Sequence, residues 1–260
     1  MTGLAERSAD LRARHLGGDP LILANVWDAA SARAVVAAGH PVVATSSAAV
    51  GAASGAGDHE QMTPHTAFEA ITRIAAAVDV PVTADLEAGY GLPAAELVER
   101  LLEAGAVGCN IEDSDHGGEL PLRDPRRQAD YIAQICEAGR RSGVEVVVNA
   151  RVDVYVRRAV PQEERLAEAI RRGRRYLDAG ATCVYPIGVT DSATIAELVA
   201  GMDGPVNTWL HPAGPPMADL RALGVARISL ASALHRHAMA RITALAEALL
   251  NDADDWIRTG

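Results

Sequence analysis

The stretch VPVTADLEAGYG at residues 80–91 decides the fold assignment. Its apolar start after a proline predicts a buried strand, and Asp85 and Glu87 follow where that strand ends. Buried strands are rich in valine and isoleucine and carry few charges. Two carboxylates at such a strand end therefore indicate a functional site, and a hard metal ion best accounts for them.

The surrounding chain repeats one pattern, in which a helical segment ends at a glycine and a short apolar run follows. The repeats are VVAAGHPVVATSS (35–47), LLEAGAVGCNIED (101–113), YLDAGATCVYPIG (176–188) and RALGVARISLAS (221–232). Glycine just past a helix end is a common C-terminal cap. Short β-branched runs that alternate with helical segments indicate βαβ units and a parallel sheet.

Eight strand–helix units fit a chain of 260 residues. We predict strands at about 21–26, 41–46, 80–86, 107–112, 144–150, 182–187, 205–210 and 226–231. We predict helices at about 28–39, 65–78, 94–104, 124–142, 161–179, 191–201, 216–223 and 232–250. A (β/α)₈ barrel needs about 250 residues, so we expect one α/β barrel domain, a TIM barrel, over residues 1–260. An open doubly wound sheet is the alternative, but no GxGxxG follows the first strand.

Composition excludes several classes of function. The formal net charge of −10 argues against nucleic acid as a partner. No apolar stretch approaches the roughly 20 residues of a membrane span, and the polar N-terminus lacks a signal core, so we expect a cytoplasmic protein. The three scattered cysteines form no disulfide framework. All 24 cationic residues are arginine, which excludes Schiff-base chemistry through a lysine.

The stretch at 48–64, AAVGAASGAGDHEQMTP, is too long for an ordinary βα connection and too rich in glycine for a firm helix. Long loops of this kind are often lids or binding loops. Among the histidines, we expect His15, His40 and His65 near the surface.

In a (β/α)₈ barrel the active site lies at the carboxyl ends of the strands. The polar residues at those ends are Trp27 and Asp28; Thr45, Ser46 and Ser47; Asp85 and Glu87; Glu112, Asp113 and Asp115; Asn149, Arg151 and Asp153; Tyr185; Trp209 and His211; and Ser229 and Ser232. The acids gather after the third and fourth strands. Oxygen ligands favour Mg²⁺, with Mn²⁺ as a second choice, and Arg151 could clamp a carboxylate with its planar fork. We expect Asp28 to cap a helix.

The chain resembles the isocitrate lyase/phosphoenolpyruvate mutase superfamily, and specifically its phosphoenolpyruvate mutase-like branch, over roughly 20–235. The motifs that carry the resemblance are NVWDAASAR (25–33), ATSS (44–47), GDHEQMT (57–63), TADLEAGYG (83–91), NIED (110–113) and NARVD (149–153). The resemblance implies a barrel that binds Mg²⁺ and a 2-oxo or 2-hydroxy acid and acts through an enolate. It also implies dimers that exchange the last helix, here about 232–260, and pair into homotetramers.

The resemblance further implies roles for individual residues. Asp85 is similar to the direct Mg²⁺ ligand, and Asp58, Glu87 and Glu112 are similar to its water-bridged neighbours. Trp27, Ser46 and Ser47 resemble the wall and the anion-binding turn of the substrate site, and Arg151 resembles the arginine that binds the substrate.

Two departures from the family pattern limit the reaction. Glu87 replaces the second aspartate of DxDxGYG. The loop 114–121 reads SDHGGELP and lacks the cysteine and lysine of the family's lyases, which argues against isocitrate or methylisocitrate cleavage. His116 is the best proton donor in this loop, with Asp115 and Glu119 behind it.

We therefore expect a Mg²⁺-dependent lyase that cleaves a C–C bond in a small 2-oxo or 2-hydroxy carboxylate, with Arg151, His116 and Glu112 in catalytic roles. A phosphoenolpyruvate phosphonomutase or phosphonopyruvate hydrolase is the alternative within the family. A catalytically silent barrel that binds an acidic metabolite is the alternative from another class.

Overall fold

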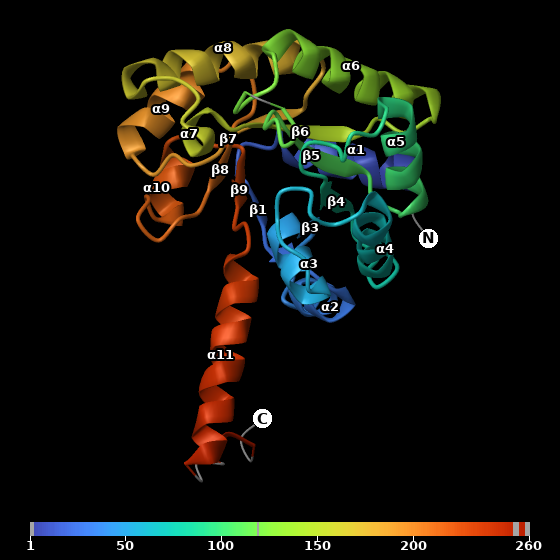
Figure 1. Ribbon diagram of the computed structural model, residues 1–260, viewed down its shortest axis with the longest axis vertical. Helices are drawn as coiled ribbons and strands as arrows, with labels where there is room; N and C mark the ends of the chain where they lie inside the picture. The colour runs from blue at the N-terminus through green and yellow to red at the C-terminus, as the bar shows by residue number, and fades with distance from the viewer. Residues whose placement is uncertain (1–2, 119, 252–254, 258–260) are drawn as a thin grey trace.

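The computed structural model describes residues 3–118, 120–251 and 255–257. The parallel strands form a closed barrel of eight staves, in which the first two strands count as one, and the helices lie outside it (Figure 1). The strands are β1 (Leu21–Leu23), β2 (Asn25–Val26), β3 (Val43–Thr45), β4 (Val82–Asp85), β5 (Gly108–Glu112), β6 (Val147–Val152), β7 (Cys183–Pro186), β8 (Asn207–Trp209) and β9 (Arg227–Ser229). Within the described residues, β1 and β2 together form the first strand, because only Ala24 separates them.

Backbone pairing runs continuously around the ring. One sheet has the order β2-β3-β4-β5-β6-β7 and the other β1-β9-β8, all in parallel pairs. A parallel bridge from Val184 to Val206 joins β7 to β8 and closes the barrel. The prediction of a (β/α)₈ barrel is confirmed, and the doubly wound alternative is excluded.

The helices are α1 (Leu4–Arg14), α2 (Ala29–Ala37), α3 (Ser47–Ser54), α4 (Pro64–Ala75), α5 (Ala94–Glu103), α6 (Pro125–Arg141), α7 (Val154–Arg157), α8 (Arg165–Asp178), α9 (Ser192–Gly201), α10 (Met217–Ala222) and α11 (Ala233–Leu250), with short 3₁₀ turns at Gln162–Glu164 and Asp255–Ile257. Sequence signals fix several of their starts. Asp28 caps α2 by accepting from the Ser31 amide, as expected. Thr63 caps α4, which has proline at its first position.

Three helices of the described chain lie outside the predicted set: α1, α3 and the short α7. The stretch at 48–64 was expected to lack a firm helix, but α3 occupies Ser47–Ser54. Ser46 caps α3, and Gly55 ends it in the left-handed region with φ 75°. A Cβ on Gly51 would lie 2.8 Å from the Gly57 carbonyl oxygen. The glycine that lowers helix propensity is therefore what lets the following loop pack against α3, and this packing outweighs propensity.

Helix α1 packs against one end of the barrel. Its Leu11 is fully buried and belongs to a small apolar cluster with Leu21, Val107 and Val147. The next residue after the α1 C-terminus, His15, is also buried, although we expected it near the surface. This end is opposite the carboxyl ends of the strands, so the site described below opens on the other side.

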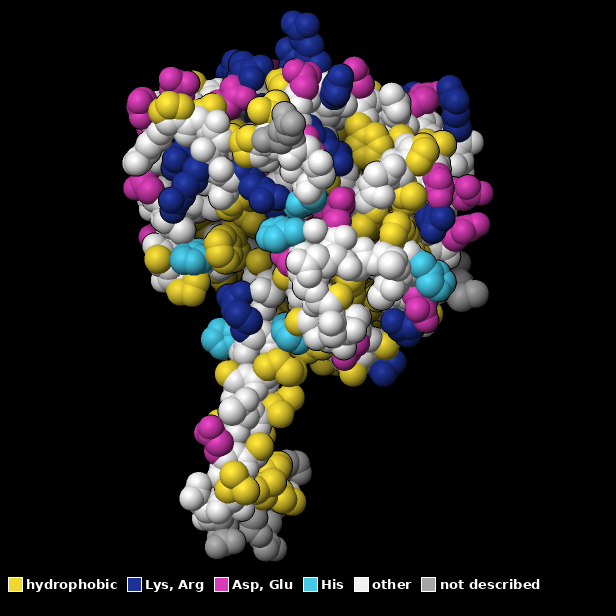
Figure 2. Space-filling view, in the orientation of Figure 1, with side chains coloured by type: hydrophobic (Ala, Val, Ile, Leu, Met, Phe, Trp, Pro, Cys, Tyr) yellow, Lys and Arg dark blue, Asp and Glu magenta, His cyan; other side chains and the backbone are white. Residues whose placement is uncertain are grey.

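The last helix, α11, leaves the barrel and projects away from it (Figure 1). No described residue of α11 is fully buried. Apolar side chains lie along its length (Figure 2), and Met239, Ile242, Leu249 and Leu250 are exposed. No helix in the described ranges is long and apolar enough to cross a membrane.

Candidate active site

A cavity of about 410 Å³ lies at the carboxyl ends of the strands. Its wall includes Asn25, Ser46, Ser47, Asp58, His59, Asp85, Asn110, Arg151, Asp153, Arg157, Tyr185, Trp209, Ser229, Ser232 and Arg236. These residues follow strands all around the ring. The barrel therefore gathers, at one place, side chains that are up to 211 positions apart, from Asn25 to Arg236.

Asp85 is held on the cavity wall by Ser47 at the start of α3. The Ser47 amide and hydroxyl donate to Asp85 Oδ2 at 3.0 and 2.9 Å, and the hydroxyl also lies 3.1 Å from Asp58 Oδ1. Asp85 Oδ1 is buried and has no hydrogen-bond partner in the part of the chain that the structure describes. A buried carboxylate oxygen without a donor, beside a second carboxylate, has the chemistry of a cation ligand. Asp85 and Asp58 therefore fit a Mg²⁺ ion.

Glu87 joins two loops next to this position. Its carboxylate accepts from the Glu60 amide at 2.6 Å and from the Tyr90 hydroxyl at 3.0 Å. The Tyr90 amide in turn donates to Glu60 at 2.6 Å. Burial raises the pKa of Glu87 to about 7. The hydrogen bond from the Glu60 amide acts in the opposite direction, because it favours the charged carboxylate. Hydrogen bonds from Glu60 and Tyr90 thus hold the Glu87 carboxylate in place.

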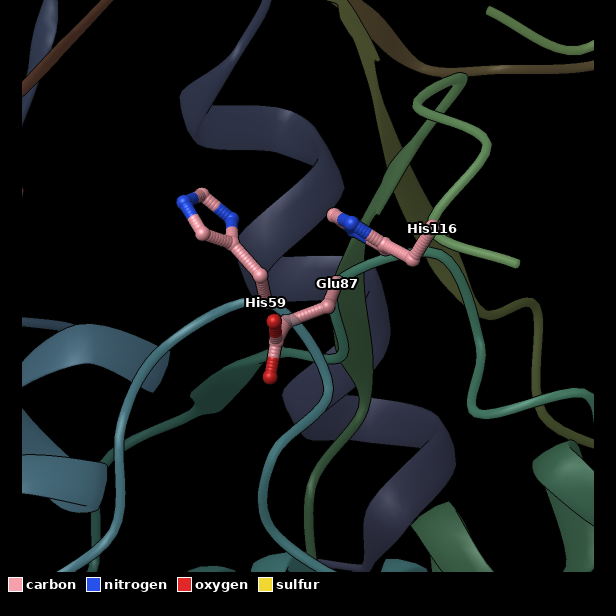
Figure 3. Close-up of side chains that lie close together, drawn as sticks. All are labelled: His59, Glu87 and His116. Atoms are coloured by element: carbon pink, nitrogen blue, oxygen red, sulfur yellow. The ribbon is translucent and has the colours of Figure 1, made fainter. Parts of the chain in front are cut away.

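Glu87 also lies close to two histidines. Ligand atoms of His59, Glu87 and His116 all lie within 4.8 Å of one another. Figure 3 shows the His116 ring pointing toward His59, with Glu87 between and below them. Two imidazoles and a carboxylate could hold a transition metal, whereas the sequence suggested an oxygen-only set. Both ring nitrogens of His116 are already hydrogen-bonded, so the Asp85 position suits a cation better.

Backbone strain is concentrated at this site. Within the described residues, the non-glycine residues with positive φ are His59, Glu60, Glu87, Tyr90, Arg158 and Ala231. The first four form or adjoin the Glu60–Glu87–Tyr90 contacts, Arg158 follows a cavity residue, and Ala231 lines the cavity. Such conformations persist only where surrounding structure imposes them, and they cluster at functional sites.

A closed ring of hydrogen bonds links the loops after β5 and β6. Arg151 contacts Asp153 at 2.6 and 2.7 Å and Glu112 at 2.7 Å. Glu112 contacts His116 Nε2 at 2.7 Å, and His116 Nδ1 lies 2.8 Å from Arg157 Nη2. The ring closes through Ser114, which accepts from Arg157 and donates to Asp153.

The ring fixes the charge of its members. Burial opposes the charge of Arg151, but Asp153 and Glu112 raise its pKa well above the ordinary value. Burial raises the pKa of Glu112, while Arg151 opposes that rise. The hydrogen bond to Glu112 raises the pKa of His116. Because Nδ1 accepts from Arg157, the neutral ring would carry its proton on Nε2 and donate it to Glu112.

The structure places the predicted site residues in three groups. Ser46, Ser47, Asp58, Asp85 and Arg151 line the cavity. Glu87, Glu112 and His116 are not among the described residues that line it; Glu112 and His116 contact Arg151 or Arg157 from behind. Trp27 lies in a separate apolar groove, with its ring 4.9 Å from that of His235. Glu119 falls outside the described residues.

Sequence reasoning missed two arginines of the cavity wall. Arg157 ends the short helix α7 and Arg236 lies in the first turn of α11, where its Nη1 donates to the Ser232 hydroxyl at 2.7 Å. Each arginine follows the end of a strand by less than two helical turns, which places it at the active-site face of a barrel. This spacing could have identified both arginines from the sequence. The cavity thus combines carboxylates at Asp85 and Asp58 with arginines that can bind an anion.

Comparisons with known proteins agree with this geometry. The family model described as phosphoenolpyruvate phosphomutase matches residues 11–250. A crystal structure from Burkholderia cenocepacia J2315, provisionally assigned as a phosphonomutase, is 41% identical with a TM-score of 0.86, and the match covers 93% of this chain and 99% of that one.

Two further relatives carry the names of lyases. Oxaloacetate decarboxylase of Pseudomonas savastanoi pv. phaseolicola (strain 1448A / Race 6) is 29% identical over 78% of this chain and 70% of its own. The crystal structure of 2,3-dimethylmalate lyase, a member of the PEP mutase/isocitrate lyase superfamily, is 26% identical with a TM-score of 0.83, over 98% of this chain and 89% of that one.

Proposed function

The chain belongs to the phosphoenolpyruvate phosphomutase family and is an enzyme of the lyase and mutase type, and we propose that it cleaves a C–C bond in a small 2-oxo or 2-hydroxy carboxylate. One observation carries this proposal: Asp85, whose Oδ1 has no hydrogen-bond partner among the described residues, and Arg151 line the same cavity. A cation and an arginine in one site can hold both oxygens of an α-oxycarboxylate.

In this proposal Mg²⁺ is the cofactor, with Mn²⁺ as a substitute. Asp85 would be its direct ligand, and Asp58 would contact it through water. Glu87 and Glu112 do not line the cavity in the described structure, so their contact through water would require them to turn toward it. When bound, such an ion supplies positive charge that stabilises an oxyanion. The support from the fold is that Asp85 Oδ1 is buried and has no other partner.

The chain's own residues supply the remaining electrostatic stabilisation. Arg151 is already held by Asp153 and Glu112, so its fork need not reorganise when charge develops on the substrate. Ser46 and Ser47 lie at the start of α3, where Ser47 orients Asp85. We propose that Arg151 binds the substrate carboxylate and stabilises the enolate that forms as the bond breaks.

We propose His116 as the proton donor. In the structure the Nε2 atom of His116 contacts Glu112 Oε1, and His116 is not among the described residues that line the cavity. Proton delivery therefore requires the hydrogen bond between His116 and Glu112 to break. His59 lines the cavity, with its ring centroid 5.5 Å from that of His116.

A second candidate function has its own support. The structure assigned as a phosphonomutase is 41% identical over 93% of the chain, which favours cleavage or rearrangement of a P–C bond. The same arginines could bind a phosphonate, since guanidinium forks suit carboxylate and phosphoryl oxygens alike.

The test is a substrate comparison with Mg²⁺ that measures pyruvate release and, for phosphonopyruvate, also the formation of phosphoenolpyruvate, because rearrangement of the P–C bond releases no pyruvate. Oxaloacetate, phosphonopyruvate and a 2-methylisocitrate-type acid are each incubated with the wild type, with Arg151→Lys and with no protein. We expect pyruvate from oxaloacetate above the uncatalysed rate, and at least a tenfold smaller kcat/KM with Arg151→Lys. Turnover of phosphonopyruvate alone would establish the second candidate, and failure with all three acids would refute both.

We also propose that the protein is a cytoplasmic homodimer or homotetramer in which α11 packs against a neighbouring copy. An apolar groove beside the base of α11, lined by Trp27, Val35, Leu230 and Leu234, is a suitable place for that contact. Exposed apolar side chains on α11 support it.

A further inference from the structure

Arg227 is a buried cation inside the barrel. It lies on β9, its side chain is 1% exposed, and it is among the largest fully buried side chains of the described chain. Nε donates to the Ser229 hydroxyl at 3.3 Å and Nη2 to Asn110 Oδ1 at 3.1 Å. Nη1 has no hydrogen-bond partner among the described residues.

No carboxylate pairs with this charge within the described part of the chain. The titratable groups around it are Cys183, Tyr185, Asp85, Cys109 and His15. Burial raises the pKa of Cys183 to about 12 and raises those of Cys109 and Tyr185 further. Burial lowers the pKa of His15 to about 4. Four of these five groups are therefore neutral near pH 7.

The remaining neighbour, Asp85, is close enough to interact with the Arg227 charge but forms no ion pair with it. Its Oδ2 is held by Ser47, and its Oδ1 contacts no donor. Arg151, by contrast, is balanced by both Asp153 and Glu112. An unpaired buried charge costs free energy in the folded protein, and guanidinium does not lose its proton at neutral pH. The fold thus retains a buried positive charge that has no direct ion-pair partner among the described residues.

Arg227 lies directly beneath the cavity. Both residues that accept its hydrogen bonds, Asn110 and Ser229, line the cavity wall. Asn110 Oδ1 also accepts from Asn149, whose own Oδ1 is buried without a partner. The Asn110 and Ser229 side chains therefore lie between Arg227 and any ligand bound in the cavity.

We propose that Arg227 is a specificity-determining residue whose unpaired buried charge, one hydrogen bond beneath the cavity floor of Asn110 and Ser229, selects anionic ligands according to their charge. The inference rests on the proposed function, because the small carboxylate substrate is the counter-charge that the barrel lacks. Arg227 acts through the field at the cavity and does not touch the ligand.

The size of the effect follows from Coulomb's law. Two unit charges on the order of 8 Å apart, at an effective dielectric constant of about 20 to 40, change affinity roughly tenfold per ligand charge. Oxalate carries one more negative charge than oxamate but has nearly the same shape. Loss of the Arg227 charge should therefore lower the preference for oxalate over oxamate roughly tenfold.

The experiment measures both affinities by calorimetry with Mg²⁺ for the wild type, Arg227→Met and Arg227→Gln. Both variants remove the charge, but glutamine keeps an amide that can donate to Asn110. We expect both to lose the oxalate preference to a similar degree. We also expect the urea midpoint of Arg227→Met to equal or exceed that of the wild type, because a buried unpaired charge is gone.

Arg172→Met is the matched control. Arg172 is also buried, but it pairs with Asp113 at 3.0 Å and Glu168 at 2.7 Å on the helix side of the strands. Its removal should lower the urea midpoint and leave the oxalate preference unchanged.

The outcomes separate the two proposals. If the wild type binds neither ligand, the proposed function fails and the inference fails with it. If the wild type binds both and the two Arg227 variants keep its preference, only the inference is overturned. If glutamine restores the preference and methionine does not, Arg227 acts through its hydrogen bond and the inference is likewise overturned.

Discussion

At the scale of single residues, Asp85 is the side chain on which the metal proposal depends. Asp85→Asn keeps the shape and the contact with Ser47 but removes the charge from the free oxygen. We expect Mg²⁺ affinity, measured by calorimetry, to fall at least a hundredfold, because the one direct carboxylate ligand is lost. Asp58→Asn, at the proposed water-bridged position, should lose less. Equal Mg²⁺ affinity in Asp85→Asn and the wild type would refute the assignment.

His116 is the second residue whose role can be tested alone. His116→Gln removes the ionisable ring, while glutamine can still donate to Glu112. If His116 delivers the proton, kcat should fall by about two orders of magnitude with KM little altered. His59→Gln, the cavity-lining neighbour, serves as the comparison. Near-normal turnover in His116→Gln would exclude it as the donor.

His15 makes stability depend on pH. Burial lowers its pKa from 6.5 to about 4 in the folded protein. Between those values the unfolded chain binds a proton that the folded chain does not, so stability is full above pH 6.5 and decreases as the pH falls toward 4. The loss is at most about 3 kcal/mol. Urea unfolding from pH 4.5 to 7.5 should show a shallower pH dependence in His15→Gln, and identical slopes would contradict this.

At the scale of elements, the turn after β4 depends on a glycine. Gly89 has φ 95°, and a Cβ there would lie 2.5 Å from the Tyr131 hydroxyl, which donates to the Leu92 carbonyl. We expect Gly89→Ala to lower the free energy of unfolding by about 2–3 kcal/mol, from left-handed strain and the displaced hydrogen bond.

Gly91 provides the control for that substitution. It also has positive φ, 67°, but a Cβ there would meet no atom within 4 Å. Gly91→Ala should therefore cost only about 1 kcal/mol, from backbone strain alone. Urea unfolding measures both, and equal losses would show that the Tyr131 contact contributes nothing.

Strands β5 and β6 together position the paired side chains of the site. Glu112 is in register with Arg151, so strand pairing alone sets their carboxylate and guanidinium side by side. The loops that follow add His116, Arg157 and Ser114, which complete the ring. Two neighbouring strands and their loops thus determine the position and charge of Arg151.

At the scale of the whole molecule, α11 is the element that the barrel does not bury. Its projection and its exposed apolar side chains favour a contact with a second copy (Figure 1). Ile242→Asp should therefore shift the protein toward the monomer in light scattering coupled to size-exclusion chromatography. Ala240→Asp, on the opposite side of the helix, should leave the assembly unchanged. A wild type that is already monomeric at micromolar concentration would refute the proposed contact.

Much of the architecture was predictable because it is local. Glycine after several helical segments and short β-branched runs indicated the elements one by one, and their alternation indicated the closed parallel barrel. Asp85 was identifiable as a carboxylate at the end of a buried strand. Among the described helices the exceptions were α1 and α3, where the polar or glycine-rich composition did not indicate a helix and packing stabilises it, and the four-residue α7 after β6.

The sequence by itself determined the barrel, the acidic strand ends and the absence of lysine chemistry, because these depend on residue type and spacing. Only the tertiary structure decided which charges are paired. It balanced Arg151 with Glu112 and Asp153, enclosed His116 between Glu112 and Arg157, and left Arg227 beneath Asn110 without a counter-ion. Arg227 and Asn110 are 117 positions apart. Electrostatic balance depends on distance in space and on burial, which spacing along the chain does not specify.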